Sequence, residues 1–177
     1  MRALIVYESM YGNTHKIATA ISEGFDRSDD VTVVSADRLD RAALELADLV
    51  VLGAPTHAHG MPRASTRKAA VEAARKNPAL TLEVDPSRPG LREWLDNRGR
   101  LDAKVAAFDT RLNGPAFVMG RASKRIARKL RHHGVSLLMP PESFFVTKDN
   151  RLVPGEVARA QEWGRRLSAA MHAVAAA

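Results

Sequence analysis

The sequence lacks cysteine altogether and contains few aromatic residues. Its 177 residues include 5 phenylalanines, 2 tyrosines and 2 tryptophans. A chain without cysteine forms no disulfide, no thiolate metal site and no thiol nucleophile, and this usage is typical of a cytoplasmic protein. No apolar stretch is long enough to span a bilayer, and the amino-terminal residues predict a strand rather than a signal peptide. We therefore expect a cytoplasmic protein with no membrane partner.

The sequence also has fewer acidic than basic residues. Lysine and arginine number 27 against 20 aspartates and glutamates, which gives a formal net charge of +7. A basic surface favours anionic partners such as nucleic acid, acidic proteins or an anionic small molecule. The most basic segment is the helix expected over residues 121–133, but no aromatic residue is interleaved and no nucleic-acid-binding motif accompanies it. A solvated outer face explains this helix better, so the sequence argues against nucleic acid as a partner.

Apolar segments alternate with amphipathic ones along the chain. The length, with 45% hydrophobic and 27% charged residues, predicts one globular domain over residues 1–177. Strands that alternate with helices predict an α/β fold with a parallel sheet. The expected strands cover residues 3–6, 31–34, 49–53, 101–108 and a last strand, interrupted by prolines, made of 135–138 and 143–146. The first expected helix begins after residue 14. The other expected helices cover 38–46, 63–77, 90–95, 121–133 and 154–175.

A polar turn containing glycine connects the first strand to the first helix. It runs from Glu8 to Thr14 and is followed by apolar residues four apart on one helix face. Unpaired N–H groups and the positive end of the helix dipole make such a helix start an anion site. Ser9, Asn13 and Thr14 add side-chain donors. The turn has no Walker lysine and no GxGxxG pattern, which argues against a nucleoside triphosphate or a dinucleotide bound in the usual ways.

Two further loops should face the same crevice, because the carboxyl ends of parallel strands meet at one edge of the sheet. Residues 54–62 follow the third strand and contain His57, His59 and Met61. Two histidines in a loop, without a third ligand nearby, are weak evidence for a metal, and we predict no metal site. Residues 109–117 follow the fourth strand and contain Phe117 as their only aromatic residue.

The turn Ser9-Met10-Tyr11-Gly12-Asn13-Thr14 resembles the phosphate loop of the flavodoxin-like family. Its Ser-Met-Tyr-Gly start is similar to the branch of FMN-dependent NAD(P)H:quinone oxidoreductases. The resemblance implies a three-layer αβα sandwich with a five-stranded parallel sheet of order 2-1-3-4-5, and FMN as the cofactor. It also makes residues 63–88 an insertion that could cap the flavin edge or build a homodimer interface.

The resemblance implies three sets of cofactor-binding residues and no catalytic side chain. The phosphate would be held by Ser9, Met10, Tyr11, Gly12, Asn13 and Thr14, and the ring by Pro55, Thr56 and His57 with Asp109, Thr110 and Arg111. The family often stacks a Trp and a Tyr on the ring, and this chain has neither in the two loops. Phe117 is therefore the only candidate for ring stacking.

Two helices have faces that the residue spacing predicts. In the helix over 63–77, Ala64, Val71 and Ala74 should face inward. Its outward residues should be Arg63, Arg67, Lys68, Arg75 and Lys76, and Arg63, Arg67 and Arg111 could place positive charge near the ring. In the last helix the inward stripe should be Val157, Ala160, Gly164, Leu167, Met171 and Val174.

Three functions remain open from the sequence. The first is an FMN-binding flavoprotein for electron transfer or an FMN-dependent oxidoreductase, with a redox partner protein or a small-molecule electron acceptor. The second is an FMN-dependent NAD(P)H:quinone reductase, although the third loop lacks the glycine-rich sequence typical of that branch. The third is a flavin-free interaction or nucleic-acid-binding module, which the positive charge and the missing stacking aromatics favour. The sequence does not decide whether the chain is an enzyme.

Overall fold

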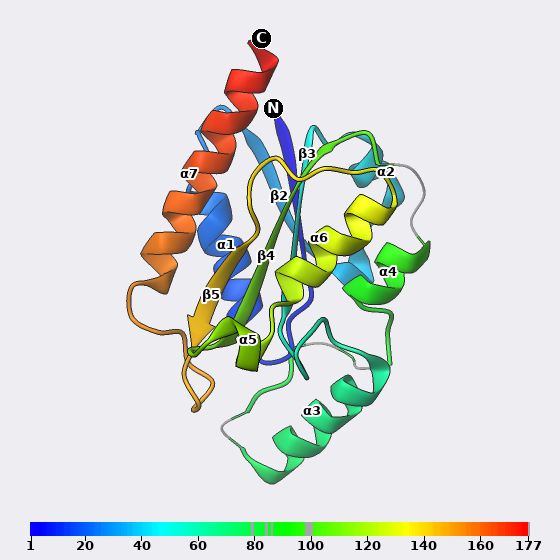
Figure 1. The fold of residues 1–177 in the computed structure, drawn as a ribbon, viewed down its shortest axis with the longest axis vertical. Coiled ribbons are helices and arrows are strands. Elements are labelled where there is room, and N and C mark those ends of the chain that lie inside the picture. The colour runs from blue at the N-terminus through cyan, green and yellow to red at the C-terminus, as the bar shows by residue number, and fades with distance from the viewer. Residues whose placement is uncertain (79, 84, 86, 98–100, 177) are drawn as a thin grey trace.

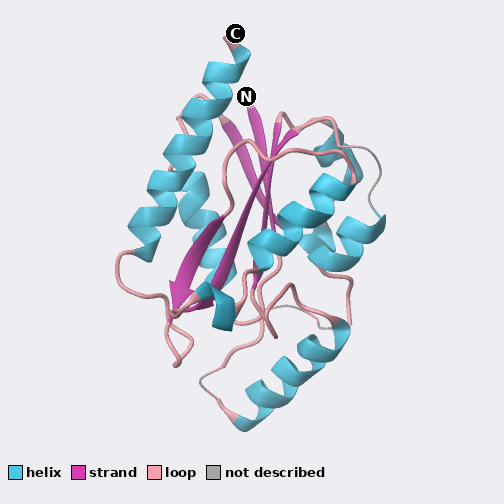
Figure 2. Ribbon diagram, viewed as in Figure 1, coloured by secondary structure: helices cyan, strands magenta, loops and turns pink. Residues whose placement is uncertain are grey.

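The computed structural model describes residues 1–78, 80–83, 85, 87–97 and 101–176, and it is built on one parallel sheet (Figures 1 and 2). The five strands have the order β2-β1-β3-β4-β5, as the family resemblance implied. Their bounds are β1 Arg2–Tyr7, β2 Asp30–Ser35, β3 Leu49–Pro55, β4 Lys104–Leu112 and β5 Glu142–Val146.

Helices cover both faces of the sheet (Figure 1). Helices α1 and α7 lie on one face, and α4 and α6 lie on the other. Helices α3 and α5 lie instead at the end towards which the strands run (Figure 1). The bounds are α1 Asn13–Glu23, a 3₁₀ turn η1 Ala36–Arg38, α2 Arg41–Glu45, α3 Ala64–Lys76, α4 Leu91–Asn97, α5 Ala116–Met119, α6 Ala122–His132 and α7 Glu156–Ala175. None of the described helices is long and apolar enough to cross a membrane.

Strands β1 and β3 are almost entirely apolar, as expected for strands whose two faces are both buried. In β1, Ile5 packs with α1 and α7, whereas its neighbours Leu4 and Val6 pack with α4 and α6. β3 alternates in the same way, with Val51 on the first face and Leu52 on the second. This pattern is the one expected for a parallel sheet between two helical layers, and it confirms the predicted sandwich.

Helices α1 and α7 approach each other closely through two glycines. A Cβ on Gly164 of α7 would collide with the carbonyl oxygen of Ile21 and would lie 3.0 Å from its carbonyl carbon. A Cβ on Gly24, just after α1, would collide with the carbonyl oxygen of Gln161. The absence of side chains at both positions therefore sets the distance between the two helices.

The structure corrects the predicted ends of the last two strands. β4 begins at Lys104 and continues to Leu112, four residues beyond the predicted end, because its polar residues after Phe108 are buried and find partners inside the protein. β5 consists of Glu142–Val146 alone. The predicted first half, residues 135–138, contributes only an isolated bridge between Leu137 and Val105, so the last strand begins after the prolines rather than being interrupted by them.

Three helix predictions also need correction. The expected helix over 38–46 is the short pair η1 and α2, and Leu46 is exposed. In α7, Val157 and Val174 are exposed although the middle of the predicted stripe is buried, because only the middle of this long helix packs on α1 and the sheet. In α3, Ala64 is exposed and Ala70 is buried, so the buried face of this helix is rotated relative to the predicted one.

Candidate cofactor-binding site

Three loops meet at the carboxyl ends of β1, β3 and β4. Backbone hydrogen bonds fix them to each other: the Glu8 N–H donates to the Gly53 carbonyl at 2.9 Å, and the Thr56 N–H donates to the Thr110 carbonyl at 2.7 Å. The sheet topology therefore brings the three predicted segments together, as expected for strands of one parallel sheet.

The first loop contains a left-handed glycine and is almost fully buried. The Gly12 N–H donates to Ser9 Oγ at 3.1 Å, and Gly12 itself has φ 87°. Ser9 and Thr14 are each 1% exposed. A side chain at Gly12 would be strained by the positive φ, so this turn depends on glycine.

Hydrogen bonds to distant residues fix the side chains of the first loop. Thr14 Oγ1 lies 2.7 Å from Thr110 Oγ1 of β4. The Asn13 amide donates to the backbone oxygen and to Oδ1 of Asn150, at 3.0 and 2.8 Å. The Tyr11 hydroxyl donates to the carbonyl of Ala70 in α3 at 3.0 Å. Asn13 and Tyr11 thus use their polar side-chain groups to position neighbouring segments.

The start of α1 offers donors that the helix itself does not use. The first N–H groups of a helix have no carbonyl partner within it, no side chain caps α1, and its first turn has no acidic residue. Ser9 accepts the bond from Gly12 and keeps its own hydroxyl hydrogen, and the Thr14–Thr110 pair uses only one of two hydroxyl hydrogens. This donor set, at the positive end of a helix dipole, fits a phosphate group, which presents only acceptor oxygens.

The second loop is a tight turn in an uncommon backbone conformation. His57 and Gly60 exchange backbone hydrogen bonds of 2.8 and 3.0 Å, and Ala58 and His59 between them have φ of 45° and 65°. Two successive non-glycine residues with positive φ indicate strain of the kind found at functional sites. Burial lowers the pKa of His57, so its imidazole is neutral at pH 7.

The second loop is joined directly to the segment after α5. His59 forms a parallel bridge with Gly120, which has φ 75° and approaches so closely that a Cβ there would collide with the backbone of His59. The second loop is therefore held against the segment between α5 and α6.

The predicted ring-binding residues Thr56 and Asp109 fix the start of α6. Thr56 Oγ1 accepts the Ala122 N–H at 2.9 Å, and Asp109 Oδ2 accepts the Ser123 N–H at 2.8 Å. Asp109 is fully buried, and burial raises the pKa of its carboxyl group. Pro55 is the last residue of β3 and pairs in register with Thr110, whose hydroxyl in turn pairs with Thr14 of the first loop.

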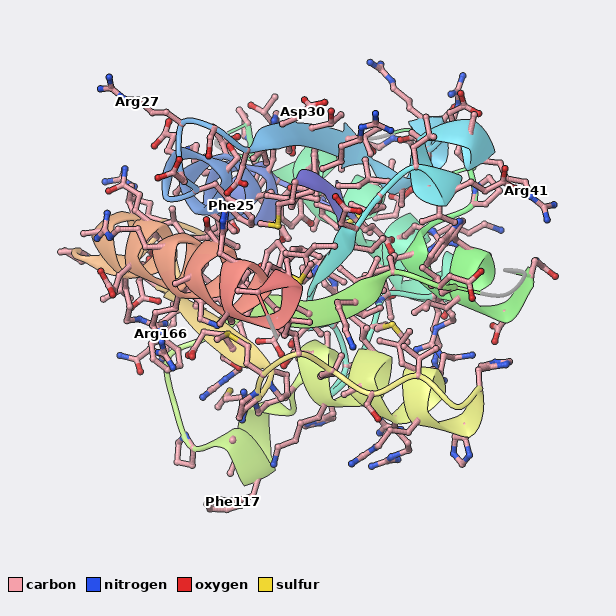
Figure 3. All side chains as sticks on the ribbon, turned by 90° about the horizontal axis from the view of Figure 1, so that it is seen from above. Phe25, Arg27, Asp30, Arg41, Phe117 and Arg166 are labelled. Carbon is pink, nitrogen blue, oxygen red and sulfur yellow. The ribbon has the colours of Figure 1, made fainter. Side chains whose placement is uncertain are left out.

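Arg111 and Phe117 have opposite environments. Arg111 is buried, donates to the carbonyls of Leu112 and Gly114 at 3.2 and 2.7 Å, and lies 4.6 Å from the centre of the Phe145 ring. It supports the turn after β4. Phe117 is 89% exposed and points away from the body of the protein (Figure 3). Phe117 is therefore not a packing residue of the core.

Arg67, which the spacing predicted on the outer face of α3, is buried. Arg67 Nη1 donates to Glu8 Oε1 at 3.2 Å, and Nη2 donates to Glu93 Oε1 at 2.7 Å. The prediction was wrong because α3 lies at the strand ends, where its inner face meets carboxylates rather than the apolar core. Arg67 therefore adds no free positive charge near the loops.

Glu8, Arg67 and Glu93 form a cluster that we call the buried ion triad. Glu8 directly precedes Ser9, and its Oε2 accepts the N–H of Leu91 at 3.0 Å. Burial raises the pKa of Glu8, and this effect is opposed by the Leu91 N–H and by the Arg67 guanidinium. The triad joins the first loop to α3 and α4.

Sequence reasoning missed three residues that shape this site. Glu8 was assigned to the turn without a role, Asn150 lies far along the chain, and Glu83 belongs to the segment between α3 and α4. The Glu83 N–H donates to the Met10 carbonyl at 3.0 Å, and its carboxylate contacts His15 Nδ1. No local motif marks such residues, because each acts through partners 59 or more residues away. Residues 79, 84 and 86 of the predicted insertion lie outside the described residues.

A large groove lies at the opposite edge of the sheet. It has a volume of about 1240 Å³ and is lined by residues at the amino ends of three strands, including Met1, Asp48 and Lys104. None of the predicted cofactor-binding residues lines it. Because parallel sheets bind ligands at the carboxyl ends of their strands, we place the candidate site at the three loops.

The comparison with solved structures gives matches over the whole fold. A flavodoxin from the domain Archaea has a TM-score of 0.65 at 19% identity and covers 97% of this chain and 99% of its own. The flavodoxin WrbA-like protein from Agrobacterium tumefaciens has a TM-score of 0.57 at 20% identity, over 97% of both chains. The rubredoxin oxygen:oxidoreductase of Desulfovibrio gigas has a TM-score of 0.63 at 18% identity, and the match covers 99% of this chain but 37% of that one.

The comparison by sequence points to the same family. A search of curated protein sequences found no match to this chain. The sequence model of the family described as flavodoxin matches residues 5–163, which is most of the chain and includes all three loops. The chain therefore belongs to the flavodoxin family.

Proposed function

We propose that this protein binds FMN at the three loops and acts as an electron-transfer flavoprotein. The observation that carries the proposal is the donor set at the start of α1, where unpaired N–H groups and free hydroxyl hydrogens converge at the carboxyl edge of the sheet. When bound, FMN supplies one-electron and two-electron redox chemistry. Ser9, Gly12 and Thr14 would hold its phosphate with the backbone N–H groups that follow them.

The chain's own residues would hold and orient the cofactor rather than react with it. The side chains of Asp109 and Thr56 cap α6, and Arg111 is bound to two carbonyls. His57 is neutral and lies in the strained turn, where it is suited to contact an uncharged ring. Because these groups have structural partners, they favour a carrier over an enzyme that needs a general acid or base at the ring.

A quinone reductase is the second candidate, and the Ser-Met-Tyr-Gly start of the first loop favours it. Such an enzyme oxidises NAD(P)H in the presence of quinone, whereas a carrier does not oxidise NAD(P)H unaided. Steady-state NAD(P)H oxidation by the FMN-loaded protein, with and without a quinone, separates the two. Turnover that depends on quinone would replace the carrier assignment.

Replacing Thr14 by valine should weaken FMN binding about tenfold, because valine keeps the shape of the side chain but can neither donate to the phosphate nor pair with Thr110. Riboflavin, which lacks the phosphate, should bind equally well to both proteins. The measurement is quenching of flavin fluorescence on titration with protein. Thr19→Val, at an exposed position of the same helix, is the control and should change neither affinity. A protein that binds neither flavin would contradict the proposal and favour a flavin-free module.

We further propose that the redox partner is an acidic protein. Next to the loops, Phe117 is accompanied by two half-exposed apolar residues, Leu112 at 43% and Val118 at 44%. The Arg125 side chain packs over Gly60 in the second loop, and among the described residues no carboxylate pairs with Arg63 or Arg125. An apolar centre with unpaired positive charge beside it suits a partner whose surface is negative.

Electron transfer from the reduced FMN-loaded protein to an acidic ferredoxin should slow about tenfold or more between low and high salt, because salt screens the attraction. Transfer to a basic cytochrome c should not slow. Stopped-flow spectroscopy measures both rates. Arg63→Glu with Arg125→Glu should remove the salt effect, and Arg27→Glu, on a side remote from Phe117 (Figure 3), should leave it. If transfer to the cytochrome were faster at low salt than at high salt, the partner would be a basic protein instead of an acidic one. Salt-sensitive DNA binding would favour nucleic acid as the partner.

A further inference from the structure

A carboxylate from another segment lies at the start of α1. Glu83 is tied to the first loop by the hydrogen bond from its N–H to the Met10 carbonyl, 3.0 Å long. Its carboxylate spans the turn: one oxygen contacts His15 Nδ1 in the first turn of α1, and the other lies 4.0 Å from the position of a Cβ on Gly12. Glu83 thus brings a negative charge to the loop that would hold the phosphate.

This arrangement is unusual because helix starts generally obtain their negative charge locally. α1 has neither a side-chain cap nor an acidic residue in its first turn. Glu83 supplies the missing charge from 68 residues away, counted from His15. A carboxylate near the positive end of a helix dipole stabilises the helix. The same carboxylate repels any other anion that binds there, because like charges close together raise each other's energy.

We propose that Glu83 is a specificity-determining residue that weakens the binding of the phosphate-bearing cofactor relative to its phosphate-free form. This inference rests on the proposed FMN function. A phosphate monoester carries between one and two negative charges at pH 7, so it is penalised by Glu83, whereas the uncharged flavin ring is not. Glu83 makes the cofactor exchangeable while it stabilises the loop in the protein without cofactor.

The test compares the affinity for FMN with the affinity for riboflavin in the Glu83→Gln variant. This variant keeps the backbone hydrogen bond to Met10 and the size of the side chain. FMN should bind about tenfold tighter than to the parent protein, and riboflavin affinity should not change. Glu83→Asp keeps the charge and should retain the parent affinity for FMN. Glu72→Gln removes one exposed negative charge from α3, which is paired with Arg75, and is the control for net charge.

Thermal unfolding of the cofactor-free protein provides a second readout with the opposite sign. Loss of the carboxylate at the start of α1 should lower the Tm of Glu83→Gln by about 1–4 °C. Tighter FMN binding by a less stable protein is not expected from a purely structural role, which would weaken FMN and riboflavin binding together. An equal change for both flavins, or no change for either, would overturn the proposal.

The experiment also separates this proposal from the proposed function. If the parent protein binds neither flavin, the FMN function fails and inorganic phosphate becomes the probe of the loop. Phosphate should then raise the Tm of Glu83→Gln more than that of the parent protein, since both offer the same donors and only one carries the repelling charge. Equal increases in Tm would refute the role of Glu83.

Discussion

Replacing Arg67 by methionine should lower the free energy of unfolding by about 3–5 kcal/mol. Arg67 is 4% exposed and bound to two carboxylates, and Glu8 is 2% exposed. Without the guanidinium, the Glu8 carboxylate stays buried beside Glu93 with only the N–H of Leu91 as a close partner. Chemical denaturation at pH 7 measures the loss. Arg75→Met, which breaks an exposed ion pair of the same helix, is the control and should change stability little.

The pH dependence of this loss has a defined sign. Burial raises the pKa of Glu8 above that of the unfolded chain, so Glu8 contributes stability at low pH that is lost as the pH rises through its folded value. Removing Arg67 raises that folded pKa further, because the guanidinium favours the ionised form. The deficit of Arg67→Met should therefore be largest at neutral pH and should shrink in acid as Glu8 takes up a proton.

A triple variant distinguishes charge from packing at the same position. Glu8→Gln and Glu93→Gln, combined with Arg67→Met, remove all three charges and keep similar side-chain volumes. We expect most of the lost stability to return, since replacing a whole buried ion cluster is often neutral. If the single and triple variants were equally destabilised, the shape of Arg67 rather than its charge would hold α3 in place.

Changing Gly164 to alanine should destabilise the protein by about 3 kcal/mol. In an exposed helix the same change stabilises by about 1 kcal/mol, because alanine favours helix more than glycine does. Here the new Cβ would collide with the backbone of Ile21, which cannot rotate away as a side chain could. α1 would have to move from α7 and carry the first loop with it.

Thermal unfolding of Gly164→Ala is the measurement, with Ala169→Gly as a control at an exposed position of the same helix. The control reports helix propensity alone and should lower stability by about 1 kcal/mol. A higher Tm for Gly164→Ala would mean that the two helices can separate at no cost, and would contradict the close packing described here.

Much of the fold could be predicted because it follows from repeated, local patterns. Apolar runs such as Leu49–Leu52 can be buried on both faces only in a sheet between helices, and the glycine-containing turn after the first strand marks the start of the first helix. The end of β4 could not be predicted in this way. Asp109, Thr110 and Arg111 are typical of a loop in sequence, yet each is buried in the strand, and Asp109 and Thr110 have partners on other elements.

The sequence predicted that the three loops meet at one edge of the sheet, but it did not predict the residues that support them. The spacing of α3 gave no reason to bury an arginine, because helical periodicity distinguishes polar from apolar faces and not one polar environment from another. The buried ion triad and Glu83 depend on contacts between α3, the connector after it and the first loop. Such contacts follow from the folded arrangement, and they leave no pattern within a window of sequence.

The first loop is completed by residues from the far end of the chain. Thr14 pairs with Thr110, 96 residues later, and Asn13 holds Asn150, 137 residues later. During synthesis on the ribosome, the amino-terminal turn emerges early but has to wait for nearly the entire chain before its hydroxyl and amide partners arrive. The full set of side-chain contacts of this loop can therefore form only after residue 150 has been synthesised, late in translation.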